Sequence, residues 1–180
     1  MDQDAHLVSR VLQGSPQAFR QLVQQHERLV WHMVSRVVSH PEDSEDICQE
    51  VFLRVYQKLP TFHFQSKLST WIATIAYRTA INYVKKDKRH AQETLDQPLP
   101  QVAPEAQDQL EKEALYTYVH QLINKLPVHY KTVLTLFHLE EMSLAEIHEV
   151  TGMPTGTIKN YLFRARKRLK DQVHEYFLKE

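Results

Sequence analysis

Apolar side chains recur every three or four positions along most of the chain, which is the spacing of one face of an α-helix. The longest stripe runs from Phe19 to about Val38, and similar stripes follow Pro41, Leu68 and Pro127. The chain has only three glycines among its 180 residues, and it is rich in Leu, Gln, Glu, Lys and Arg, which favour helices. We therefore predict an all-α protein.

The N-terminal pattern predicts two helices separated by a glycine turn. The first spans residues 4–13, ends at Gly14 and buries its apolar side chains, which are Leu7, Val8, Val11 and Leu12. Ser15 followed by Pro16 is typical of a helix N-cap with proline in the first turn, so the long second helix should begin there.

The last third of the chain, from Met142 to Leu169, has the pattern of a helix-turn-helix. Ser143 and Glu146 form the spacing of a capping box, and Gly152 supplies the left-handed residue that ends a helix. The following helix is apolar on one side and has no acidic residue from Lys159 to Lys170. A helix with a cationic outer face after such a turn is suited to a DNA major groove. The alternative is a surface hairpin with an ordinary solvated basic face.

Two further segments carry polar or basic faces in addition to the apolar faces that a core needs. A helix over residues 41–59 begins with acidic residues, which the helix dipole favours, and it projects a polar face that could simply be solvated. A loop at residues 61–68 precedes a helix over 69–89 with a basic end, to which Lys85, Lys86 and Arg89 contribute. Aromatic rings beside a cationic strip are typical of surfaces that bind single-stranded nucleic acid.

Charge is unevenly distributed although the net charge is zero. Residues 1–90 carry 12 basic and 9 acidic side chains, residues 91–113 carry 1 and 6, and residues 114–180 carry 9 and 7. We predict two small helical domains, at 1–90 and 110–180, joined by a flexible acidic linker at 91–109 that contains three prolines. Phosphate neutralisation provides most non-specific DNA affinity, so a neutral protein of this kind should bind DNA weakly without a partner.

Other classes of function find little support in the sequence. The single cysteine, Cys48, lies on an apolar face, and the histidines are not paired three or four residues apart, so we expect no catalytic residue, no metal site and no cofactor. The sequence shows neither a signal peptide nor a membrane-spanning run, which with one cysteine suits the cytoplasm. We expect a cytoplasmic protein that is not an enzyme and takes no small-molecule substrate.

Four stretches of the chain carry a family resemblance: residues 45–56, 68–83, 126–134 and 156–169. Taken together and in this order, they are similar to the extracytoplasmic-function sigma factors of bacterial RNA polymerase. The resemblance covers nearly the whole chain. It implies a sigma region 2-like domain, a sigma region 4-like domain, core RNA polymerase and promoter DNA as partners, and an anti-sigma factor that in this family is often membrane-attached.

The resemblance also implies roles for individual residues. The surface that grips core polymerase would be Asp46, Gln49, Glu50, Leu53, Arg54 and Gln57. The loop that captures a base from the melted −10 element would be His63, Phe64, Gln65, Ser66 and Lys67, with Trp71, Arg78 and Asn82 on the next helix. Duplex −35 DNA would be recognised by Thr155, Thr157, Lys159, Asn160, Phe163 and Arg164, with Arg166 and Lys167 as phosphate anchors or packing margins.

Phe64 departs from the family pattern, because this loop usually contains a glycine there. Glycine permits positive φ, so the loop could follow a different path, and the Phe64 ring could stack on a flipped base or fill the core. Trp71 is similarly open to two interpretations: burial in the apolar stripe, which we favour, or a wedge between bases. The linker, at about twenty residues, reaches about 66–72 Å when extended, enough for promoter elements about two helical turns apart.

The main alternative is an autonomous two-domain regulator that binds duplex DNA without polymerase. It would explain the helix-turn-helix but would leave the Asp46–Gln57 face and the aromatic-basic helix without a role. A pure adaptor would not use the basic recognition helix. The two surfaces together therefore favour a promoter-specificity subunit.

Overall fold

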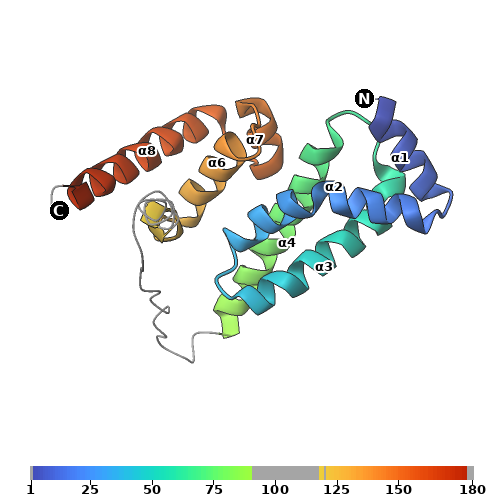
Figure 1. Ribbon diagram of the computed structural model, residues 1–180, viewed down its shortest axis with the longest axis horizontal. Helices are drawn as coiled ribbons and strands as arrows, with labels where there is room; N and C mark the ends of the chain where they lie inside the picture. Colours follow the sequence, from blue (N-terminus) through green and yellow to red (C-terminus); the bar gives the residue numbers. More distant parts are fainter. Residues whose placement is uncertain (1, 91–117, 120, 178–180) are drawn as a thin grey trace, which may run out of the picture.

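The computed structural model describes residues 2–90, 118–119 and 121–177, and every regular element in them is helical (Figure 1). The predicted all-α class is confirmed, whereas the predicted linker at 91–109 lies outside the described residues. The elements are α1 (Asp2–Leu12), α2 (Pro16–Ser35), α3 (Pro41–Lys58), a 3₁₀ turn η1 (Leu59–Thr61), α4 (Leu68–His90), α6 (Val128–His138), α7 (Leu144–Thr151) and α8 (Thr155–Phe177).

Helices α2, α3 and α4 pack against one another and form the first unit, with α1 lying on α2 (Figure 1). The turn between α1 and α2 is local in origin: Gly14 has a φ of 83°, and the Ser15 side chain accepts a hydrogen bond from the backbone N–H of Ala18 at 3.3 Å. Pro16 occupies the first turn of α2, where its missing N–H costs nothing. The predicted start of α2 is confirmed.

The prediction for Leu12 is wrong, because this side chain is 51% exposed while Leu7, Val8 and Val11 are buried. Successive helical residues point about 100° apart, and α1 has a neighbour on only part of its circumference. Val11 takes the inward position at the end of the helix, which leaves Leu12 turned towards solvent.

Helices α6, α7 and α8 form the second unit, which contains the predicted helix-turn-helix. Ser143 and Glu146 make the predicted capping box: the Ser143 side chain accepts from the Glu146 N–H, and the Ser143 N–H donates to the Glu146 carboxylate at 2.8 Å. Gly152 ends α7 in the left-handed conformation with a φ of 73°. These local signals set the angle at which α8 leaves the turn, because both ends of α7 are fixed by them.

The two units are in contact. Helix α7 packs against α4, and α6 packs against α2 (Figure 1). The buried apolar side chains form one connected cluster that includes residues of both units, from Leu7 to Ala165. The described parts of the chain therefore form one body rather than two separated ones.

Candidate nucleic-acid and polymerase interfaces

The polar face predicted on α3 is present and exposed. Ile47, Val51 and Val55 are buried on one side of the helix. The six residues predicted to bind polymerase all lie on the exposed side: Asp46, Gln49, Glu50, Leu53, Arg54 and Gln57. Leu53 is 61% exposed, which leaves a large apolar side chain in the middle of a polar face. An apolar anchor surrounded by polar groups is typical of a protein-binding surface.

Glu50 and Arg54 form an ion pair on this face, with the Arg54 Nη2 and Nε atoms 2.6 and 2.9 Å from Glu50 Oε1. Both side chains are nearly half exposed, and surface pairs one helical turn apart contribute little stability. A partner can therefore replace this pair with its own contacts at small cost.

Sequence reasoning missed Tyr56, which is half exposed and lies one turn after Leu53 on α3. Its ring makes an edge contact with Phe19 of α2, with centroids 5.0 Å apart. The contact holds the ring in place, so Leu53 and Tyr56 together extend the apolar part of this surface. The sequence could have indicated this residue, because Tyr56 follows Leu53 by three positions and so lies on the same side of the helix.

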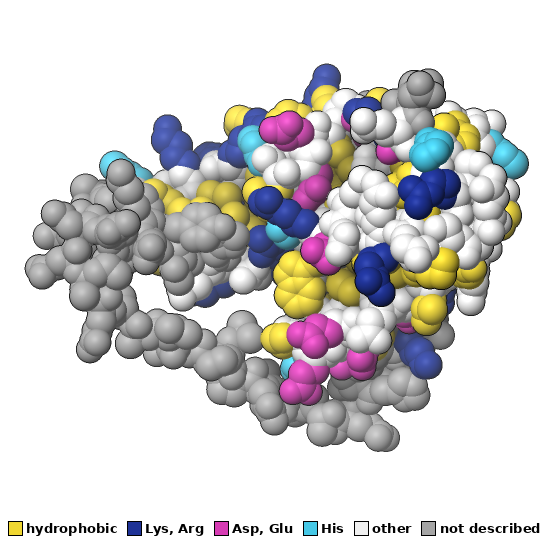
Figure 2. Space-filling view, turned by 45° about the vertical axis from the view of Figure 1, so that its right-hand side comes forward, with side chains coloured by type: hydrophobic (Ala, Val, Ile, Leu, Met, Phe, Trp, Pro, Cys, Tyr) yellow, Lys and Arg dark blue, Asp and Glu magenta, His cyan; other side chains and the backbone are white. Residues whose placement is uncertain are grey.

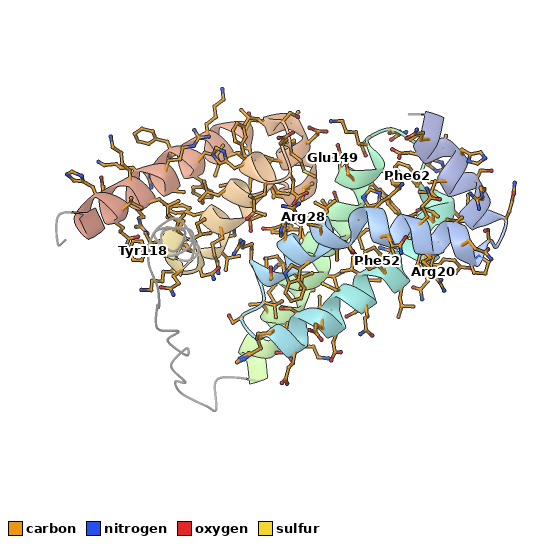
Figure 3. The ribbon with its side chains drawn as sticks, viewed as in Figure 1. Arg20, Arg28, Phe52, Phe62, Tyr118 and Glu149 are labelled. Atoms are coloured by element: carbon orange, nitrogen blue, oxygen red, sulfur yellow. The ribbon has the colours of Figure 1, made fainter. Side chains whose placement is uncertain are left out.

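The loop before α4 is organised around Phe62, which is buried and labelled in Figure 3. Its ring lies 4.6 Å from the Phe64 ring and 5.1 Å from the Trp71 ring, measured between centroids. Phe64 has a φ of 55°. The backbone at Phe64 is therefore in the left-handed conformation that glycine favours, although a phenylalanine stands there.

The Phe64 ring is 45% exposed, so it covers Phe62 on one side and faces solvent on the other. A non-glycine residue in this conformation is strained, at a cost of about 1–3 kcal/mol, and the contact with Phe62 helps to offset it. Trp71 is half-buried in the aromatic cluster, in agreement with the favoured interpretation of burial. An exposed ring above buried rings is a platform on which a base can stack.

The cationic strip on α4 is exposed where the structure describes its side chains, at Arg78, Asn82, Lys85 and Lys86. The side chain of Arg89 lies outside the described residues. The remaining loop residues His63 and Gln65 are exposed and Ser66 is half-buried. The opposite side of α4 is buried, including Tyr77, whose hydroxyl pKa is raised by burial. The helix thus separates a charged face from a core face, as predicted.

Lys67 is also exposed, but it is engaged with the second unit. Its Nζ atom lies 2.8 Å from Oε1 of Glu146, the acidic member of the capping box on α7. Lys67 and the Ser143 backbone N–H hold the pKa of Glu146 down to about 2 by hydrogen bonding to its charged form. Lys67, which is predicted to bind the −10 element, is therefore in contact with the first turn of the helix-turn-helix.

Helix α8 has the predicted division into a core face and a cationic face. Ile158, Leu162 and Ala165 are buried. The residues predicted to contact the −35 element are exposed, except for Thr157, which is half-buried: Thr155, Lys159, Asn160, Phe163, Arg164, Arg166 and Lys167. Phe163 is 67% exposed, and no described large apolar side chain is more exposed. An exposed ring among cations can contact a thymine methyl group in a major groove.

Arg166 is held against α6 rather than directed only to solvent. Its Nε and Nη2 atoms lie 3.2 and 3.0 Å from His138 Nε2, and its guanidinium lies 5.3 Å from the centre of the Phe137 ring. Burial and the neighbouring Arg166 charge lower the pKa of His138, which suits a neutral imidazole that accepts from the guanidinium. Of the two roles left open for Arg166, these contacts favour the packing margin.

The molecular surface carries no large region of one charge on the face drawn in Figure 2, where acidic, basic and apolar side chains alternate. This agrees with the zero net charge of the chain. None of the described helices is long and apolar enough to cross a membrane. No group of three metal-ligating side chains occurs among the described residues.

Comparison with known proteins identifies both units. Residues 22–90 match the family model described as Sigma-70 region 2, and residues 116–169 match Sigma-70, region 4. The RNA polymerase sigma-H factor of Pseudomonas aeruginosa is 31% identical over 99% of this chain and 97% of its own. The ECF RNA polymerase sigma-E factor of Haemophilus influenzae is 32% identical over 94% and 95%, and the ECF sigma factor SigW of Bacillus subtilis is 29% identical over 93% and 95%.

Solved structures show the same fold. The sigma factor RpoE of Bartonella quintana, solved with the anti-sigma factor NepR, aligns with a TM-score of 0.71 at 20% identity, covering 87% of this chain and 96% of that one. CnrH, solved with the cytosolic domain of CnrY, aligns with a TM-score of 0.66 at 18% identity over 94% and 96%.

Proposed function

Because the chain belongs to the extracytoplasmic-function sigma factors of bacterial RNA polymerase, we propose that it directs promoter-specific initiation through three separate surfaces. Residues 1–90 dock on core polymerase and hold the melted −10 strand, and residues 110–180 recognise the −35 element. One observation carries this division: each set of predicted contact residues lies on a helix or loop whose other side is core.

The α3 face docks on the largest subunit of polymerase. Leu53 and Tyr56 supply the apolar centre, and Glu50, Arg54 and Gln49 supply the polar margin. Desolvating two large apolar side chains provides affinity, while the charged groups around them fix the orientation of the partner.

The loop and α4 hold the non-template strand of the −10 element. The exposed Phe64 ring provides a stacking surface, and the strip from Arg78 to Lys86 follows the phosphates. Each stacked base contributes about 1–3 kcal/mol, so a few rings and cations suffice to stabilise a short melted segment. The buried Phe62 fixes the Phe64 ring before DNA arrives, which lowers the entropy lost on binding.

Helix α8 enters the major groove of the −35 element with Lys159, Asn160, Phe163 and Arg164 facing the bases. Arginine can donate two hydrogen bonds to guanine and asparagine can bind adenine in the same way, which gives this face sequence discrimination. Lys167 contributes a phosphate contact that positions the helix, whereas Arg166 packs α8 against His138 and Phe137 of α6.

We propose that the polymerase performs all the chemistry, so this chain is not itself an enzyme, and that the chain works in the cytoplasm. The two aligned proteins were solved in complexes with NepR and with the cytosolic domain of CnrY. By analogy, an anti-sigma protein, which could be membrane-attached, holds this chain until a signal releases it.

The docking surface can be tested by size exclusion of the purified chain with bacterial core RNA polymerase. Co-elution is expected for the unmodified chain. Gln49→Ala combined with Glu50→Ala should weaken the complex by roughly tenfold, since interface truncations commonly cost about 1 kcal/mol each or somewhat less. The matched control is Gln24→Ala with Glu27→Ala on the exposed side of α2, which should co-elute like the unmodified chain. Equal loss in both variants would contradict the assignment of the α3 face.

A further inference from the structure

A cavity of about 230 Å³ lies where α6 and α8 meet the end of α2. Half of its lining is aliphatic and comes from four side chains of the second unit: Ile123, Leu134, Leu139 and Leu169. Leu139 is 45% exposed, so the cavity opens to solvent on this side. Sites for drug-sized ligands usually measure about 300–1,000 Å³, so this cavity fits a smaller ligand of about ten non-hydrogen atoms.

The other half of the lining is polar or cationic. Arg36 at the end of α2 and Arg166 on α8 contribute guanidinium groups, while Thr135 and His138 on α6 contribute a hydroxyl group and an imidazole. None of the described residues that line the cavity is acidic. The cavity therefore combines aliphatic walls with a surplus of positive charge.

Two titratable groups at the cavity respond to this positive charge. Burial and the Arg36 charge lower the pKa of Lys131, which precedes Leu134 by three residues on α6. Burial and the Arg166 charge lower the pKa of His138. Both groups are thus less favourable as cations than they are in water, and an anion in the cavity would offset the repulsion.

The two guanidinium groups are held in place by the protein. Arg36 is 8% exposed and donates to the Asn124 side-chain oxygen at 2.8 Å. The Arg166 Nε and Nη2 atoms lie 3.2 and 3.0 Å from His138 Nε2, and its guanidinium lies over the Phe137 ring. A guanidinium has five N–H donors, and these contacts of Arg166 use two of them. A guanidinium that is already positioned loses little entropy when it binds an anion.

We propose that this cavity binds a small apolar monocarboxylate, with its carboxylate on the two guanidinium groups and its hydrocarbon part against the aliphatic walls. Arginine matches a carboxylate with two parallel hydrogen bonds, which gives the anion a defined orientation. A carboxylate carries a single charge, so it costs less to bury than a doubly charged phosphate monoester. Binding at this site requires neither polymerase nor DNA.

Octanoate is a suitable probe, because it joins one carboxylate to a short aliphatic chain. The full chain, labelled with ¹³C at its leucine and isoleucine methyl groups, can be titrated by NMR at constant ionic strength. Octanoate should shift the signals of Ile123, Leu134 and Leu169, and it should leave those of the buried Leu22 and Ile72 in the first unit unchanged. For a ligand of this size we expect a Kd on the order of 1 mM.

Two matched ligands separate the contribution of the charge from that of the hydrocarbon chain. 1-Octanol keeps the chain and lacks the charge, so it should bind roughly fivefold more weakly or worse. Acetate keeps the charge and lacks most of the apolar surface, so it should bind at least about tenfold more weakly. 1-Octanol that binds as tightly as octanoate would overturn the assignment of a carboxylate ligand.

Arg166→Gln tests the site from the side of the protein. It removes one of the two charges and should weaken octanoate binding about three- to tenfold. The matched control is Arg168→Gln, which removes a cation that does not line the cavity and whose guanidinium lies 5.4 Å from the centre of the Tyr130 ring. This control should bind octanoate like the unmodified chain.

Two further results would overturn the site. One is a set of octanoate-induced shifts spread equally over both units, which indicates non-specific association. The other is equal weakening by Arg166→Gln and Arg168→Gln, which indicates a general effect of charge. The comparison of ligands uses the unmodified chain, so its outcome does not depend on whether a variant folds.

Discussion

The proposed −10 surface and the proposed −35 surface present different chemistry to DNA. The −10 surface combines three neighbouring rings, Phe62, Phe64 and Trp71, with cations that lie further along α4. The −35 surface is a single helix face of cations and amides with one exposed ring, Phe163. Unpaired bases offer their faces for stacking, whereas paired bases offer only their edges in a groove. The difference matches the melted −10 and duplex −35 DNA that the two surfaces are proposed to bind.

The two surfaces also differ in what holds them in shape. The −35 helix is set by signals within a few residues: the capping box at Ser143 and Glu146, and the left-handed Gly152. The −10 loop depends on tertiary packing of Phe62, because the backbone of Phe64 is in a conformation that its own sequence disfavours. Disrupting one buried ring should therefore damage the −10 surface more than any single exposed change damages the −35 surface.

The largest effect is expected for Phe62→Ala. Removing a buried phenylalanine ring typically costs about 3–5 kcal/mol, and here it also removes the support of Phe64 and Trp71. Chemical denaturation of the full chain measures the loss. Ile147→Val, which removes one methylene from the core of the second unit, should cost only about 0.5–1.5 kcal/mol. A Phe62→Ala variant as stable as the unmodified chain would contradict the central position of this ring.

Arg164→Ala should reduce transcription from a −35-dependent promoter. If the Arg164 guanidinium binds a base edge with two hydrogen bonds, its loss raises the free energy of the transition state by about 1–3 kcal/mol. Run-off transcription with the unmodified and variant chains measures it. Lys170→Ala removes a cation from the same helix outside the predicted face and serves as the control. Unchanged transcription with Arg164→Ala would remove this residue from the base-reading face.

Phe64→Gly and Phe64→Ala separate backbone strain from the aromatic ring. Both remove the ring, so each should weaken binding of the melted −10 strand by about 1 kcal/mol or more. Glycine accepts a φ of 55° without strain, so it should leave the loop more stable than alanine by up to about 1 kcal/mol. Equal strand affinity in all three chains would show that the ring does not stack on DNA.

The smallest effect concerns the acid dependence of the contact between Lys67 and Glu146. The pKa of Glu146 is lowered to about 2 from an ordinary value near 4.5, so its stabilising contribution is complete above pH 4.5 and is lost as pH falls towards 2. The difference in melting temperature between the unmodified chain and Glu146→Gln should be constant from pH 6 to 8 and shrink below about pH 4.5. A difference that stays constant down to pH 3 would contradict the lowered pKa.

Much of the fold could be predicted because its signals are local. The caps at Ser15 and Ser143, the glycine turns and the apolar periodicity place α2, α7 and the core faces without reference to distant residues. Leu12 shows the limit of periodicity, because an apolar stripe does not indicate how much of the helix surface its neighbours will cover. The exposed faces of α3 and α8 were predictable for the same reason, as the complement of a recognisable core stripe.

The remaining features depend on contacts between distant residues. No pattern near Lys67 indicates that Glu146 will lie beside it, and no pattern near His32 indicates Glu140. The pairing of Arg166 with His138 is likewise set by the packing of α8 on α6. Such contacts arise only when helices far apart in the sequence are brought together, so they could not be predicted from the chain alone.

Transcription by reconstituted polymerase tests the proposed sigma-factor function most directly. The direct measurement is run-off transcription on genomic fragments with core enzyme alone, with the added chain, and with the Arg164→Ala variant. We predict discrete new start sites only when the chain is present, preceded by two shared sequence elements about two helical turns apart. Tight binding of duplex DNA by the chain alone, with no new start sites when core polymerase is added, would instead identify an autonomous regulator.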